Sequence, residues 1–362
     1  MSSTALRSAD LPRPSLRGTA WLSLRQERTT LLLGGGVLLL VCAWALGLGL
    51  AIDHWITANG LQGCNEVYFP PECTGRYDRE VSIPPWWPPA VVGTGWVLVL
   101  LPVALGLFVG APLLAREFES GSYRLAWTQS VSRTRWLAGR LAAPLLLTLL
   151  GSSLLAVVSS WFAGVVQGRF GVPGYYHWFT WMARSTHGTA SVGFCLLGLT
   201  LGLTVGLVVR RVVAAIAVTA VLTALLRLTV DQLRYLFAPA LESLAPVQVT
   251  VLPARSDQVV RLFQTDFPAH SPLESDLLEV GYRSSDGYRI SELGSWPPST
   301  MPDGRLLCQA QGCLDHPDIT HAYALYHPPS DVWAVMWTQT GLCLGLAALL
   351  IGFCFLRVRR MR

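Results

Sequence analysis

Long apolar runs separated by short polar stretches dominate this sequence. Six runs are long enough to cross a bilayer, whose hydrocarbon core of about 30 Å requires roughly 20 residues of α-helix. They cover residues 31–51, 90–115, 141–166, 190–209, 212–236 and 333–356. The pattern predicts an all-α polytopic membrane protein with six transmembrane helices. The first run is too long, and its basic leader too extended, for a cleaved signal peptide.

The junction between the fourth and fifth runs and the end of the fifth run carry charge. Arg210 and Arg211 separate the two runs and predict a tight turn between spans. The second half of the fifth run contains Arg227, Asp231 and Arg234. The four-residue spacing of Arg227 and Asp231 fits an ion pair at the membrane interface, or a polar element of a translocation pathway.

Arginines mark one side of the predicted membrane protein. The short flanks richest in arginine are residues 1–30, 116–140, 210–211 and the tail after residue 356, whereas loops 52–89 and 167–189 are poorer. Because basic residues accumulate on the cytoplasmic side, both termini are predicted to lie inside. The expected location is the plasma membrane, where the chain spans the bilayer several times.

The same pattern divides the chain into four parts. Residues 1–30 form a cytoplasmic tail, and its basic and apolar residues 16–30 fit either an interfacial helix or a basic flank that fixes topology. Residues 31–237 contain the first five helices. Residues 238–332 are predicted to be an extracellular domain with a strand at 247–252, and residues 333–362 form the sixth helix and a basic cytoplasmic tail.

Composition excludes several catalytic classes. Only 14% of the 362 residues are charged, whereas soluble domains carry about 25%. All 27 basic residues are arginine, so the chain lacks the lysine of a P-loop, a protein kinase or a pyridoxal-phosphate enzyme. No carboxylate lies in the middle of a span, which argues against proton coupling. Energy for any transport is therefore expected from a partner.

The eight cysteines fall into two groups. Four lie in apolar runs, where packing as small hydrophobic side chains is the expected role: Cys42, Cys195, Cys343 and Cys354. The others form two pairs in predicted outer loops, Cys64 with Cys73 and Cys308 with Cys313. Two local disulfides are predicted, with free thiols or a metal site as alternatives. The spacing to nearby histidines fits no standard zinc pattern.

Small residues recur every fourth position in two of the spans. Gly198, Gly202 and Gly206 share one face of the fourth span, and Gly106 and Gly110 have the same spacing in the second. This spacing lets helix backbones approach closely. It predicts helix packing, either within the chain or between two copies.

The loop after the second span is the candidate contact with a partner. It places Glu117 and Glu119 in a basic region, followed by Gly121, which can end the helix that continues from the span. Tyr123 and Trp127 are four residues apart and share one face of the next short helix. An aromatic stripe flanked by arginine fits a docking surface for a soluble subunit, or a helix that rests on anionic headgroups.

At this loop the sequence resembles the permease subunits of type-2 ABC transporters, especially actinobacterial members. The matching positions are Arg116, Glu117, Glu119, Gly121, Leu125, Ser132, Arg133 and Gly139. Ser122, Ser130 and Arg140 depart from the family's Thr, Pro and Lys. Residues 21–28 and 326–341 also look like family members.

The resemblance implies an exporter subunit that pairs with a second permease, alike or different, and docks onto ATP-binding subunits through coupling loop 116–136. ATP and Mg would be bound by the partner, so no cofactor, metal, catalytic residue or nucleic-acid partner is expected on this chain. By analogy, the coupling interface comprises Arg116, Glu117, Glu119, Gly121, Tyr123, Arg124, Trp127 and Arg133, and residues 227–234 lie near the outer gate.

Two other classes of function remain open from the residues. One is a membrane sensor or self-protection protein that transports nothing. The other is a membrane-embedded enzyme acting on lipid or cell-wall precursors, although the chain has neither a Gly-x-Ser-x-Gly nor a His-Glu-x-x-His motif.

Overall fold

Six long apolar helices form the body of the protein. The computed structural model describes residues 28–61, 84–128, 132–166, 186–233, 239–252, 260–265, 276–284, 289–290, 306–308 and 319–361. Five of the spans are α2 (Arg28–Ala58), α7 (Arg133–Val166), α9 (Gly188–Val209), α10 (Val212–Gln232) and α12 (Val332–Arg360). Span two consists of α4 (Trp87–Ala104), η1 (Leu105–Gly110) and α5 (Ala111–Ser120). All six have the length and composition to cross a membrane, which confirms the six-helix prediction.

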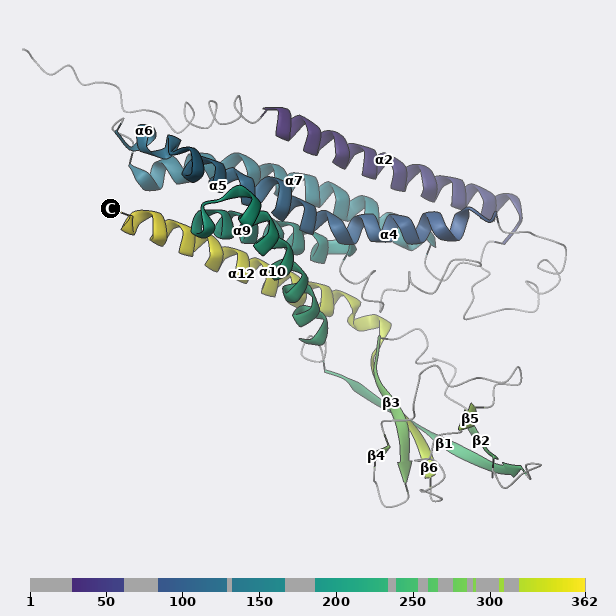
Figure 1. Cartoon of the computed structure of the whole chain (residues 1–362). Helices are drawn as coiled ribbons and strands as arrows, with labels where there is room; N and C mark the ends of the chain where they lie inside the picture. Colours follow the sequence, from purple (N-terminus) through teal and green to yellow (C-terminus); the bar gives the residue numbers. More distant parts are fainter. Residues whose placement is uncertain are drawn as a thin grey trace, which may run out of the picture.

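The arginine-rich segments gather at one end of the helical body. Figure 1 shows the start of α2, the short helix α6 (Ser122–Thr128) and the C-terminal end of α12 at that end. A β-sheet joined to α10 and α12 lies at the opposite end. The alternation of the spans thus agrees with the arginine pattern, while the side of the membrane on which each end lies stays a prediction.

Span four, α9, is the central helix. It contacts α12, α7, α10 and all three parts of span two. A Cβ atom placed on Gly106 would lie 2.6 Å from the carbonyl oxygen of Gly198, and one on Gly110 would lie 2.5 Å from that of Leu199. Cβ atoms on Gly198, Gly202 and Gly206 of α9 would likewise meet carbonyl oxygens of span two. The five glycines Gly106, Gly110, Gly198, Gly202 and Gly206, called the glycine contact below, therefore pack backbone against backbone within the chain.

Span two is not a regular α-helix. Residues 105–110 form a π-helix, in which the N–H of Ala111 bonds the carbonyl of Gly106 five residues earlier. Pro102 precedes this stretch and Pro112 follows it, and neither has an N–H to donate. π-helical turns are rare and carry an extra residue per turn. The apolar pattern predicts one uninterrupted helix over 90–115 and gives no sign of this change.

In its described residues, the loop between spans five and six forms a six-stranded antiparallel sheet. Its strands are β1 (Leu241–Leu252), β2 (Val260–Thr265), β3 (Asp276–Ser284), β4 (Arg289–Ile290), β5 (Leu306–Cys308) and β6 (Ile319–His327), in the order β4-β3-β6-β1-β2-β5. β1 pairs with β6 from Leu241 opposite Tyr326 onward. An ion pair of 2.9 Å joins Glu242 on β1 to Arg283 on β3. The predicted strand at 247–252 is confirmed, and it is the end of β1.

The cysteines divide as expected where they are described. All four cysteines of the spans are buried and unpaired, which confirms that they pack as small hydrophobic residues. Cys64, Cys73 and Cys313 lie outside the described residues, and Cys308 is described only as part of β5. The two disulfides therefore stay a prediction. Residues 1–27, which include most of the predicted interfacial helix, also lie outside the described part of the chain.

Candidate functional site

A sharp turn follows span two at the arginine-rich end. Helix α5 ends at Ser120, and Gly121 takes up a left-handed conformation with φ 74° and ψ 4°. A side chain is strained in this region, whereas glycine enters it freely. Helix α6 then begins at Ser122. The prediction that Gly121 ends the helix and that a short helix follows is confirmed.

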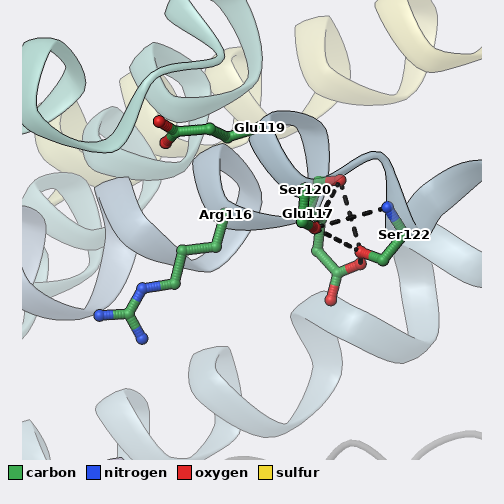
Figure 2. A pocket seen from close by; sticks show the side chains of 5 residues that line it. All are labelled: Arg116, Glu117, Glu119, Ser120 and Ser122. Atoms are coloured by element: carbon green, nitrogen blue, oxygen red, sulfur yellow. Dashed lines mark hydrogen bonds between the residues drawn. The ribbon is translucent and has the colours of Figure 1, made fainter.

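Glu117 fixes this turn to its neighbours. Its carboxylate forms an ion pair with Arg140 of α7, and the two side chains are only 15% and 12% exposed. The hydroxyl of Ser122 donates to the same carboxylate at 2.5 Å, and the hydroxyl of Ser120 donates to Ser122 at 3.0 Å (Figure 2). One carboxylate therefore joins the end of α5, the start of α6 and the first turns of α7.

Glu119 points in a different direction from Glu117 (Figure 2). Its carboxylate accepts a hydrogen bond of 2.9 Å from the backbone N–H of Val212, which lies 93 residues later in the chain. Val212 is the first residue of α10, and the first N–H groups of a helix have no partner inside it. A carboxylate at this position both satisfies the donor and complements the helix dipole.

The aromatic stripe of α6 faces the protein itself. The ring of Tyr123 lies 4.8 Å from that of Phe118 and 4.8 Å from that of Trp127. Trp127 also meets Trp136 of α7 at 6.1 Å, and these rings pack on a buried cluster that includes Leu137. Tyr123 and Trp127 are half-buried, so part of the stripe packs on its own bundle, and its role as a docking surface stays a prediction.

Two arginines tie the aromatic rings to the C-terminus of α12. The guanidinium of Arg133 lies 4.7 Å from the Trp127 ring and donates to the carbonyl of Met361. The guanidinium of Arg210 lies 5.4 Å from the Phe118 ring, and its donor is 3.9 Å from the sulfur of Met361. Sequence reasoning identified Arg133 but missed Met361, which is 228 residues away and carries no chemical signal.

The outer side of the turn is polar and open. A shallow hollow of ≈ 350 Å³ is lined by Arg116, Glu117, Glu119, Ser120 and Ser122. Arg116 is exposed and extends away from the serines (Figure 2). Arg124 is also exposed, and its Nε donates to the Tyr123 hydroxyl at 3.3 Å. This hydrogen bond raises the pKa of Arg124, so the side chain stays cationic.

The predicted outer polar group is only partly described. The guanidinium of Arg227 lies 5.0 Å from the ring of Phe194 and lines a narrow pocket with Pro102, Gly198 and Thr223. This places Arg227 between α10, α9 and span two. The side chain of Asp231 and the whole of Arg234 lie outside the described residues, so their pairing stays a prediction. Within the described residues, no group of three or more His, Cys, Asp and Glu could hold a metal ion.

Fold and site together define a six-span membrane protein whose polar contacts converge on a short helix after span two. A family model described as ABC-2 membrane transporter related matches residues 35–234, and the chain belongs to this family. The match begins within α2, runs through α10 and ends before the sheet. Neither the search of curated proteins nor the search of solved structures found a match.

Family membership confirms the resemblance seen in the sequence. The protein is a permease component of an ABC transporter, which is a multi-pass membrane subunit and not itself the catalytic one. Membership of this family implies association with the membrane and with an ABC ATP-binding subunit.

Proposed function

We propose that the chain is the membrane subunit of an ATP-driven exporter of the plasma membrane, that it works as a dimer, and that a separate ATP-binding subunit docks on α5 and α6. The observation that carries this proposal is the attachment of α6. Through Glu117, the start of α6 is bound at once to α5 and to α7. A force applied to α6 is therefore passed to spans two and three rather than lost in a loose loop.

The docking face is the polar side of α6 and the adjoining hollow. Tyr123 and Trp127 pack inward, whereas Ser120, Ser122 and Arg124 are exposed. Arg124 is a permanent cation, so the matching surface on the ATP-binding subunit is expected to be acidic. The aromatic rings contribute by holding α6 in place.

Photo-crosslinking of the full chain tests the docking face. A photoreactive amino acid is placed at Ser122, which is exposed on α6, and in a control at Leu244, which is exposed on β1. Illumination of the complex with the ATP-binding subunit is expected to give an adduct from position 122 and none from position 244. A subunit that co-purifies but forms its adduct from position 244 contradicts the proposal.

Transport itself is tested in two steps. Compounds are first screened for those that raise ATP turnover of the reconstituted complex. A radiolabelled hit is then offered to inside-out vesicles, and an exporter accumulates it only when ATP is added outside. Accumulation without the ATP-binding subunit contradicts the proposal.

A further inference from the structure

The hydrogen bond between Glu119 and Val212 joins the cytoplasmic ends predicted for spans two and five. We propose that Glu119 is a positioning residue that passes movement of α5 and α6 to α10. This inference rests on the proposed docking of an ATP-binding subunit at α6. It assigns to Glu119 a role inside the permease instead of a contact with the partner.

Glu119 is placed where it can connect α5 to α10. It lies in the last turn of α5, two residues after Glu117, yet it binds a different helix. A second contact joins the end of α5 to the turn between α9 and α10, because the guanidinium of Arg210, the C-cap of α9, lies 5.4 Å from the Phe118 ring. Arg210 has φ 58°, so the turn before α10 is compact. The end of α5 is thereby held to the start of α10 by a carboxylate and to the turn before it by a ring.

Helix α10 buries the smallest share of its apolar stretch within the chain among the six described spans. Within this stretch only 17% of the residues are buried. At its start, Val213 is 82% exposed. A helix with few packed neighbours moves at lower cost than one enclosed by others. The same two helices also share a buried cluster of Ala111, Ala115 and Ala215, and Glu119 adds the polar contact through which displacement of α5 acts on the first N–H of α10.

Arg116 provides a contrast on the same helix. It lies one turn before Glu119, is exposed and lines the hollow, and its side chain extends away from the serines (Figure 2). Both side chains are exposed, so the difference between them is the hydrogen bond that Glu119 accepts from another helix. The carboxylate of Glu119 accepts a hydrogen bond from the backbone N–H of Val212, whereas no such contact to α10 is described for Arg116.

The bond is tested first on the isolated full-length chain in lipid nanodiscs. Hydrogen exchange of the Val212 amide is measured by mass spectrometry for the wild type, Glu119→Ala and Glu119→Gln. Loss of a charged acceptor in Glu119→Ala is expected to speed exchange about tenfold. Glu119→Gln keeps an oxygen that accepts the same N–H, so most of the protection is expected to remain. Equal exchange in Glu119→Ala and the wild type overturns the proposal.

Transmission is tested on the complex with the ATP-binding subunit. ATP is expected to change the exchange of residues 212–220 in the wild type, and this change is expected to vanish in Glu119→Ala. The adduct from position 122 must persist in the same variant, because docking is left intact. A variant that responds to ATP like the wild type overturns the proposal.

The outcomes separate this inference from the proposed function. Loss of the adduct in Glu119→Ala alone shows that Glu119 serves docking, which overturns the link and leaves the docking proposal standing. Absence of the adduct in the wild type refutes docking at α6, and transmission from α6 falls with it.

Discussion

Helices α9 and α10 are neighbours in sequence and nearly equal in apolar character, yet they are packed very differently. Their apolar stretches differ little in hydropathy, but 72% of that of α9 is buried and only 17% of that of α10. The difference lies in the glycines. Helix α9 brings Gly198, Gly202 and Gly206 against span two, whereas α10 contains no glycine.

This contrast teaches that apolar character does not bury a helix in a membrane. Lipid tails are as apolar as leucine, so close association depends on small residues and polar contacts. Helix α9 is held by backbone contacts along its length, whereas α10 packs along one narrow face, with Ala215 buried against α5, and is also bound at its start by Glu119. The first arrangement is suited to a fixed support and the second to a helix that moves.

The largest effect is expected from Gly202→Ala, which attacks the fixed helix. The added methyl group would meet the carbonyl oxygen of Gly106, a backbone atom that cannot turn aside. Overpacking at such a contact is expected to cost about 3 kcal/mol. Thermal unfolding in detergent measures the loss. The matched control is Gly345→Ala in α12, where no atom lies within 4 Å of the new Cβ, and its unfolding temperature is expected to be unchanged.

A smaller effect on stability is expected from Trp127→Ala in α6. The substitution removes a half-buried ring that contacts Tyr123, Trp136 and the guanidinium of Arg133. Partial burial makes the expected loss about 2 kcal/mol, below that of a fully enclosed tryptophan. Limited proteolysis is expected to cut between α6 and α7 more readily, and stimulation of ATP turnover to fall. Trp127→Phe keeps an aromatic ring there and is expected to retain most of both properties; equal loss in both variants would contradict this account.

The sequence predicted the features that depend on nearby residues. Apolar run length located all six spans, Gly121 marked the end of α5, and Arg210 with Arg211 marked the turn before α10. Each of these is decided by fewer than about 25 neighbouring positions. The spacing of glycines also identified the packing faces, although it left open whether they meet within one chain or between two.

The contacts between distant segments could not be predicted in this way. Glu119 and Val212 are 93 residues apart, and nothing in either local pattern names the other. The inward direction of Tyr123 and Trp127 depends on where α7 lies, which periodicity does not specify. The π-helix in span two leaves no trace in hydropathy because all six of its residues are apolar or glycine.

Substitution of Glu117 tests how the turn between α5 and α6 is held against α7. Glu117→Ala removes the partner of Arg140 and the acceptor of the Ser122 hydroxyl. The expected loss is about 1.5 kcal/mol, because a charged hydrogen-bonded pair is broken and a shielded guanidinium is left behind. A double-mutant cycle with Arg140→Leu separates the pair from the rest. Additive losses in the cycle would mean that the two side chains do not interact.

The smallest effect on the fold is expected from Arg124→Ala, on the exposed side of α6. Its guanidinium lies outside the packed rings, so the unfolding temperature is expected to match that of the wild type. Binding to the ATP-binding subunit is expected to weaken about fivefold at low salt and to converge with the wild type at high salt, because screening removes the attraction of an exposed charge. Arginine is cationic throughout the neutral range, and the hydrogen bond to Tyr123 raises the pKa of Arg124 further, so the difference should not depend on pH. Binding that changes with neither the substitution nor the salt concentration would exclude this face as the docking surface. The aromatic side of α6 would then be the candidate.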